Sequence, residues 1–235
     1  MPEPHDWRAE VDDWWAGLLR LPAAAVRAGG VFALSHVDHV GVVAVDGASA
    51  PIVHGPPDVL PALHAATRAG GRDLVGGRAV AAALGSRAGD VRGPAWYGYA
   101  TTETLGPSPG RAVRALDERD LPLLARLHER TPPAEREESG TTGLPAYGCI
   151  DDGELLAVAC LGMWERMPTI GVLTDPRARG RGLAGLVVTA AATAGLDRRV
   201  VVQYRARRAN AASIAVATRC GFSYYGDGVV IDLVP

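Results

Sequence analysis

The pattern of apolar and polar positions predicts a mixed α/β fold over the first hundred residues. In residues 5–20, tryptophan, valine and leucine recur every three or four positions, which is typical of an amphipathic helix. The same reading predicts strands at Val31–Val37, Gly41–Val45 and Ala95–Ala100, and helices near Asp58–Ala69 and Gly77–Leu84.

A run of glycine, proline and serine at residues 105–110 then predicts a linker. Beyond it, helices are predicted at Asp117–Arg130, Leu183–Leu196 and Ala211–Arg219, the last capped by Asn210. Strands are predicted at Arg111–Ala115, Ala146–Ile150, Leu155–Trp164, Thr169–Thr174 and Arg199–Tyr204, with a closing pair in Phe222–Leu233. A polar loop is predicted from Thr131 to Pro145. We therefore expect an N-terminal α/β region at 1–104 and a second domain at 111–235.

Composition narrows the function classes. The net charge of −2 argues against nucleic-acid binding, which needs a broad basic excess. The chain contains no lysine, and this excludes the Walker lysine and Schiff-base chemistry, including that of pyridoxal phosphate. Basic residues that are all arginine, with abundant alanine and glycine, suggest a bacterium with a GC-rich genome.

Three cysteines without a C-x-x-C pair make a zinc or redox site unexpected. His36 and His39 superficially resemble the opening strand of a metal-binding module, with His54 and His64 nearby. No repeated unit supplies further ligands, so we expect a hairpin with partly exposed histidines and no metal. No apolar run reaches about 18 residues and the start lacks a basic segment, so a cytoplasmic protein is expected.

The most informative segment joins a predicted strand to a predicted helix. An apolar run ends at Asp175-Pro176, an arginine- and glycine-rich turn follows, and the helix opens at Leu183. Such a junction presents free backbone N–H groups and the positive end of a helix dipole. Gly180 and Gly182 have no side chains and so allow a ligand to approach the main chain closely. The turn is therefore predicted to hold an anion, with a pyrophosphate as the expected ligand.

A dinucleotide site fits this turn poorly. Gly180, Gly182 and Gly185 match G-x-G-x-x-G by letter. The acidic residue expected about 20 positions later to hold a ribose is missing, because residues 201–203 read Val-Val-Gln.

Two ordered motifs resemble the GCN5-related N-acetyltransferase (GNAT) superfamily instead. Its pyrophosphate signature, Arg/Gln-x-x-Gly-x-Gly/Ala, is read as Arg179-Gly180-Arg181-Gly182-Leu183-Ala184. A second signature is read as Asn210-Ala211-Ala212-Ser213 followed by Cys220-Gly221-Phe222. The resemblance implies the acyl-CoA N-acyltransferase fold, an α/β (α+β) fold with a mixed, mostly antiparallel sheet and a splayed central strand pair. The N-terminal half resembles the partial, degenerate GNAT-like half found in a bacterial two-half subgroup.

The resemblance also implies acetyl-CoA, or another acyl-CoA, as co-substrate. The pantetheine arm would pair with Val172, Leu173 and Thr174. The cofactor side would further include Arg179, Gly180, Arg181, Gly182, Leu183, Ala184, Asn210 and Ser213. An amine would attack the thioester directly, with a backbone N–H of the splayed strand stabilising the oxyanion.

Catalytic side chains are harder to assign. Glu165 and, in the 131–145 loop, Glu135, Glu137 and Glu138 are the candidate bases, and each is also readable as solvated surface. Ala217 stands where the family often has a thiolate-protonating tyrosine. Tyr204 and Tyr224 are possible substitutes, although a buried core role suits either.

Two questions stay open at this point. An acyl-CoA-binding sensor or scaffold without turnover is the alternative to an enzyme. The acceptor amine is not identified: the acids at 135–138, with Asp151 and Asp152, would attract a cationic amine or form plain surface. A homodimer is also left open.

Overall fold

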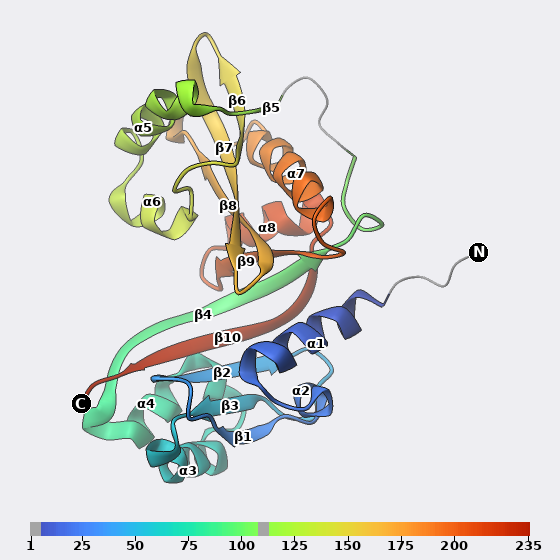
Figure 1. Ribbon diagram of the computed structural model, residues 1–235. Helices are drawn as coiled ribbons and strands as arrows, with labels where there is room; N and C mark the ends of the chain where they lie inside the picture. Colours follow the sequence, from blue (N-terminus) through green and yellow to red (C-terminus); the bar gives the residue numbers. More distant parts are fainter. Residues whose placement is uncertain (1–5, 108–112) are drawn as a thin grey trace. The chain divides into compact units, whose positions relative to one another are not determined.

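The computed structural model describes residues 6–107 and 113–235 (Figure 1). The chain forms two compact units. Unit 1 contains the described part of Met1–Tyr97 together with Ala206–Ala211 and Tyr224–Pro235, and unit 2 contains the described part of Gly98–Arg205 with Ala212–Ser223. Unit 1 is therefore assembled from segments at both ends of the sequence.

Unit 1 is an α/β unit, as the apolar pattern predicts. Its helices are α1 (Trp7–Leu19), α2 (Ala23–Ala28), α3 (Leu60–Gly70) and α4 (Arg78–Leu84), with short 3-10 turns at Pro57–Val59, Gly71–Gly76 and Gly85–Arg87. Its strands are β1 (Gly30–Ala33), β2 (His39–Val45), β3 (Ile52–Gly55), β10 (Ser223–Leu233) and most of β4 (Ala88–Ala100). Asp6 caps α1 by accepting hydrogen bonds from the amides of Arg8 and Ala9.

The expected hairpin around His36–His39 is not formed. β1 pairs in parallel with β3, and β2 pairs antiparallel with the other edge of β3, so β3 separates the two strands. The strand β3 is four residues long and lies between Pro51 and Pro56, and such a short segment carries too little periodicity to be recognised.

The end of the chain also differs from expectation. The closing pair of strands predicted in Phe222–Leu233 is a single strand, β10. It pairs antiparallel with β2 over seven residues, from Gly226↔Val45 to Asp232↔His39. Val229 and Ile231 on β10 join the core beneath α3 and α4, where Leu63 and Val80 are fully buried.

Unit 2 follows the predicted order with one added helix. Its helices are α5 (Leu121–Glu129), α6 (Pro133–Ser139), α7 (Leu183–Leu196) and α8 (Ala211–Cys220), with 3-10 turns at Glu118–Asp120 and Pro176–Ala178. Its strands are β5 (Arg114–Ala115), β6 (Ala146–Asp151), β7 (Glu154–Trp164), β8 (Met167–Thr174) and β9 (Val202–Arg207). The predicted strand at Arg111–Ala115 and linker at 105–110 fall partly on residues 108–112, which lie outside the described residues.

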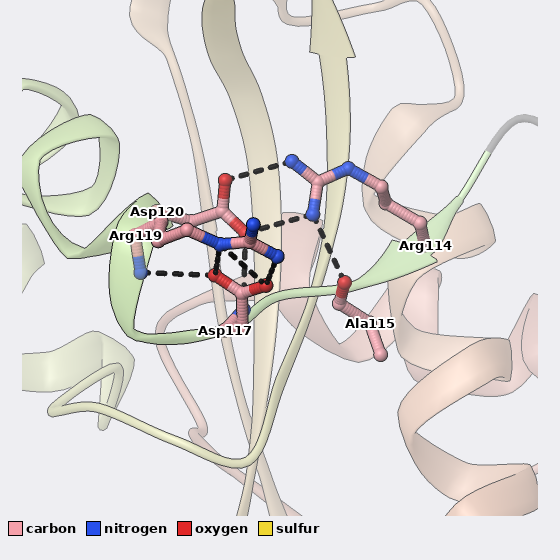
Figure 2. A network of polar contacts seen from close by, with 5 residues as sticks. All are labelled: Arg114, Ala115, Asp117, Arg119 and Asp120. Atoms are coloured by element: carbon pink, nitrogen blue, oxygen red, sulfur yellow. Dashed lines mark hydrogen bonds and ion pairs between the residues drawn. The ribbon is translucent and has the colours of Figure 1, made fainter.

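A polar network fixes the 3-10 turn Glu118–Asp120 that leads into α5 (Figure 2). Asp117 and Asp120 form a capping box, in which the Asp117 amide donates to Asp120 Oδ2 at 3.0 Å. Arg114 holds Asp120 with two hydrogen bonds of 2.7 Å each, and this lowers the pKa of the Asp120 carboxyl to about 2. Arg119 pairs with Asp117. The network ties β5 to the helix that follows it.

The sheet of unit 2 has helices on both faces. The strand order is β9-β8-β7-β6-β5, antiparallel except for β8 and β9. Leu124 and Leu127 of α5 pack with Val158, Cys160 and Leu173 on one face. Figure 1 shows α6 on the same side as α5 and α7 on the other side. The fold is the predicted mixed, mostly antiparallel α/β fold.

The predicted polar loop at Thr131–Pro145 is wrong in one part, because it contains α6. The sequence of α6, PAEREES, has no apolar stripe, so the periodicity gives no helix signal. Pro133 at its first position and Gly140 in the left-handed conformation after its end are the local signals that favour the helix.

In the part of the chain that the structure describes, none of the helices has the length and apolar character needed to cross a bilayer.

Candidate active site

The central feature of unit 2 is an opening between β8 and β9. β8 pairs with β7 along its whole length, from Met167↔Trp164 to Thr174↔Ala157. Among the described residues, β8 pairs with β9 only at Thr169↔Gln203 and Ile170↔Tyr204. The splayed central pair expected from the sequence is therefore present, and from Gly171 onward one edge of β8 presents unpaired main-chain groups.

A buried carboxylate anchors the turn that follows β8. Asp175 is fully buried and caps the 3-10 turn by accepting from the Arg177 amide at 2.9 Å. Arg130 Nε donates to Asp175 Oδ2 at 2.7 Å. Hydrogen bonds from Arg177 and then Arg130 hold the pKa of the Asp175 carboxyl well below its usual range, against the opposing effect of burial.

The glycine turn itself is open. Gly180 and Gly182 have φ angles of 77° and 78°, which strongly favour glycine, and a Cβ added at either would meet no atom within 4 Å. Residues 179–182 are exposed, and α7 begins directly after Gly182. The Gly185 amide donates to the Gly182 carbonyl oxygen at 3.1 Å, and the amides at the start of α7 carry the positive end of its dipole. The turn has the space and the donors that an anionic group requires.

Each arginine of the turn is paired with a carboxylate. Arg179 Nη2 lies 2.5 Å from Glu135 Oε2 of α6, and Arg181 Nη2 lies 3.8 Å from Asp151 Oδ2. Arg177 contacts both Asp175 and Glu154. Glu135 and Asp151, two of the acids that the sequence offers as attractors of a cationic acceptor, are thus held by the turn.

Two of the predicted site residues lie in contact on the α8 side. Tyr204 Oη is 2.9 Å from Ser213 Oγ, and the Tyr204 ring meets Phe222 edge-on at 5.4 Å. Burial raises the pKa of Tyr204 to about 12, with smaller contributions from Cys220 and Glu138, while the hydrogen bond with Ser213 opposes the rise. The phenol is therefore protonated at neutral pH. Ala217 is fully buried on the same helix.

The two candidate carboxylates are placed very differently. Glu138 lies on α6, and its negative charge makes a small contribution, after burial and Cys220, to the raised pKa of the Tyr204 phenol. Glu165 is an exposed residue with φ 48° in the turn between β7 and β8. The backbone of β8 between this turn and the opening runs four residue steps, from Met167 to Gly171, or roughly 13 Å.

Asn210 directly precedes α8, at the predicted helix start. Its amide donates to the Arg207 carbonyl oxygen at 2.8 Å. Its role toward a cofactor stays a prediction. The same holds for Tyr224, whose hydroxyl donates to Asp227 Oδ2 in unit 1.

Sequence reasoning missed the close contact between β8 and the end of α6. A Cβ at Gly171 would lie 2.4 Å from the Ser139 carbonyl oxygen and 2.7 Å from Gly140. Glycine at 171 thus lets α6 rest on β8 at the start of the opening. Finding it requires the pairing of distant segments, which no local pattern supplies. The Arg205–Trp164 stack and the buried Gln203 side chain were missed for the same reason.

A metal centre is not indicated by the described residues, because no three His, Cys, Asp or Glu side chains there are grouped as ligands.

Comparison with known proteins gives one family and several solved structures. A putative acetyltransferase of the GNAT family from Novosphingobium aromaticivorans is 26% identical, with 62% of this chain and 65% of that chain covered and a TM-score of 0.48. A GNAT-family acetyltransferase from Colwellia psychrerythraea is 14% identical, with coverage of 63% and 59% and a TM-score of 0.48. The ribosomal-protein-S18-alanine N-acetyltransferase from Escherichia coli is 19% identical, with coverage of 51% and 90% and a TM-score of 0.39.

The chain thus spans less than two thirds of the length of the first two of these proteins, at 65% and 59%. No curated protein matches the chain significantly.

The family model of the acetyltransferase (GNAT) family matches residues 111–222. That range contains the opening between β8 and β9, the glycine turn and both sequence motifs. Residues 111–222 of this chain are therefore a domain of the acetyltransferase (GNAT) family.

Proposed function

We propose that the protein is an acetyl-CoA-dependent N-acetyltransferase that acetylates a primary amine of a small molecule or peptide. The observation that carries the proposal is the opening between β8 and β9 beside an exposed glycine turn. An elongated ligand with an anionic end fits this combination, since the strand edge offers main-chain hydrogen bonds and the helix start offers amides for a diphosphate.

In this arrangement the backbone of Val172–Thr174 pairs with the pantetheine arm as a further strand would. The backbone of Gly180 to Ala184, together with the side chains of Arg179 and Arg181, holds the diphosphate at the start of α7. The thioester then lies at the other end of the exposed edge, near Ile170 and Gly171, where β8 and β9 separate. Asn210 and Ser213 complete the cofactor side.

The reaction forms a C–N bond and breaks the C–S bond of the thioester. The neutral amine attacks the carbonyl carbon, and a backbone N–H of the free β8 edge stabilises the oxyanion. One proton leaves the nitrogen and one is taken up by the departing thiolate. Glu138 on α6 and Glu165 in the turn between β7 and β8 are the two candidate bases for the proton of the amine.

The proton for the thiolate needs a source other than residue 217, which is alanine. We assign it to Tyr204, whose hydroxyl is held by Ser213 at 2.9 Å beside the strand opening. The phenol carries its proton at neutral pH, as an ordinary phenol does, and its hydroxyl group can donate that proton.

The test is acetyl transfer to an amine library, with thiol release followed in time and products identified by mass spectrometry. Gly182→Glu tests the cofactor site directly, because a carboxylate at the turn repels the diphosphate. We expect acetyl-CoA binding to fall below detection while the protein stays folded, since no atom lies within 4 Å of the new Cβ.

The matched control is Gly47→Glu in unit 1. Gly47 also has φ 78° and is exposed, and its added Cβ would meet only Arg27 Nη1 at 4.0 Å. The variant thus adds the same charge and backbone strain away from the turn. Undiminished acetyl-CoA binding by Gly182→Glu would refute the site.

A sensor or scaffold that binds acyl-CoA without turnover is the second candidate, favoured by the fully buried Ala217 in place of a tyrosine. Binding of acetyl-CoA without thiol release for any amine would select it.

A further inference from the structure

One face of the unit 2 sheet carries a polar cluster beside the strand opening. The strands are paired at Gly162↔Thr169 and at Thr169↔Gln203, so these three residues lie on one face of the sheet. Side chains two residues apart in a strand point to the same side, so Trp164 of β7 and Arg205 of β9 belong to that face as well. It is the face covered by α5 and α6, since Cys160 and Leu173 are on it as well.

Arg205 is the cation of this cluster. Its guanidinium carbon lies 4.4 Å from the centre of the Trp164 ring, and the side chain is exposed. Among the described residues it has no carboxylate partner, whereas Arg177, Arg179 and Arg181 each have one. An aromatic ring orients a guanidinium without neutralising it, so both edges of the fork remain available to an anion.

Gln203 adds an unmatched acceptor two residues earlier on β9. Its side chain is fully buried and Nε2 donates to Tyr99 Oη at 2.7 Å, while Oε1 has no partner in the described structure. A buried carbonyl oxygen without a donor is unfavourable, and a ligand N–H removes that penalty.

The position of the cluster along the strands indicates whether it would bind the acceptor amine or the diphosphate of the cofactor. Arg205 directly follows Tyr204, whose partner Ile170 is the last β8 residue paired with β9. The glycine turn begins beyond Thr174, four residues or roughly 13 Å further along β8. The cluster is therefore at the thioester end of the proposed cofactor path, where the acceptor amine must arrive, and is far from the diphosphate end.

We propose that this cluster is the acceptor subsite and that the acceptor is an amine carrying a carboxylate, of the amino-acid class. Arg205 binds the carboxylate through its fork, Trp164 holds the guanidinium in place and packs on the apolar part of the acceptor, and Gln203 Oε1 accepts from an acceptor N–H. The inference rests on the proposed function and specifies its substrate class. A carboxylate-bearing acceptor thus takes the place of the cationic amine considered from the sequence. Two of the acids that would attract such a cation, Glu135 and Asp151, are already paired with arginines.

The experiment measures how tightly three kinds of ligand bind to the CoA-saturated protein at equilibrium. The ligands are amino acids, the carboxamides of those amino acids, and the polyamine spermidine. Each carboxamide keeps the amine and side chain and lacks only the charge. We expect several amino acids to bind at least tenfold more tightly than their carboxamides. Arg205→Gln should weaken the binding of the amino acids about 10- to 100-fold, because hydrogen bonds to a charged group are lost. The same variant should leave the affinity for the carboxamides unchanged. Arg205→Lys should restore part of the loss, because it keeps the charge without the fork.

Arg199→Gln is the matched control, because it removes one exposed positive charge from the segment before β9. It should change no affinity. Equal affinity of acids and carboxamides for the wild type, or tightest binding of spermidine, overturns the subsite. A weaker affinity of Arg205→Gln for CoA itself also overturns the subsite, because it would show that Arg205 binds the cofactor.

Turnover is measured separately on the same ligands. If CoA binds and the acid preference holds but no amine is acetylated, the acceptor subsite stands and the enzymatic proposal fails. If amines are acetylated without a preference for a carboxylate, and Arg205→Gln does not change that activity, the enzymatic proposal stands and the acceptor subsite is wrong.

Discussion

At the scale of single residues, His54 of β3 couples the stability of unit 1 to pH. Its side chain is 4% exposed, Nδ1 has no partner in the described structure, and the ring lies against the Gly41 backbone. Burial, with the nearby His39 and His36, lowers the pKa of His54 to about 4 from 6.5. Between pH 6.5 and about 4, His54 is therefore protonated in the unfolded state and neutral in the folded state.

The expected result is a loss of unfolding free energy as the pH falls from 6.5 to about 4, amounting to about 3 kcal/mol. His54→Gln, which does not titrate, should lack this part of the slope. Denaturant unfolding at several pH values measures it by fluorescence, because four of the five tryptophans belong to unit 1. His64→Gln on exposed α3 should keep the slope. An identical slope in His54→Gln would contradict the assignment.

Single positions also mark the limit of what the sequence predicts. Gly180 and Gly182 were identifiable because a strand, an arginine pair and a helix start surround them locally. Gly171 reads as an ordinary strand residue, and its requirement for glycine arises only from the α6 carbonyls packed against it. Tyr204 and Ser213 were each candidates, but their contact could not be known before β9 and α8 were placed.

At the scale of elements, the ion pair between Arg179 and Glu135 links α6 to the glycine turn. If Arg179 contacts a diphosphate, Glu135 has to give up its partner, and its negative charge also opposes the ligand. Glu135→Gln should therefore tighten CoA binding. Both side chains are about half exposed, and such pairs contribute up to about 1 kcal/mol, so a gain of no more than about fivefold in Kd is expected by calorimetry.

Glu137→Gln is the control, since it removes the same charge from the same short helix without breaking that pair. Equal affinities for the two variants would show that overall charge, and not the release of Arg179, sets CoA binding.

Elements differed in how well the sequence predicted them. The bounds of α7 were obtained as observed, because a left-handed glycine directly before it marks its start and its apolar content is high. α6 was missed because its composition is polar, and β10 was divided in two because Gly226 and Gly228 interrupt its apolar run. Pairing partners, such as β3 between β1 and β2, are set by tertiary packing that periodicity does not report.

At the scale of the molecule, unit 1 depends on the last strand of the sequence. β10 is hydrogen-bonded to β2 over seven residue pairs and is the neighbour of β4 in the sheet order. Val229 and Ile231 are 2% and 0% exposed, and burying two such side chains stabilises by about 3–6 kcal/mol in total. That is comparable with the whole stability of a small domain.

A chain ending at Phe222 should therefore lose unit 1 while retaining unit 2. Hydrogen exchange followed by mass spectrometry should show β2 amides exchanging as in an unfolded chain and β6–β7 amides still protected. A chain ending at Leu233, which keeps β10, should match the full protein. Unchanged protection of β2 in the shorter chain would contradict this dependence.

The placement of β10 also constrains how the protein is made. Synthesis from Ala100 to Ser223 takes on the order of ten seconds at typical elongation rates. Throughout that time β2 has been translated and its neighbour β10 has not. A bare strand edge is a template for pairing with other chains. The nascent polypeptide therefore passes through an interval in which residues 39–45 need shielding on the ribosome, and crowded polysomes are where its misassembly would begin.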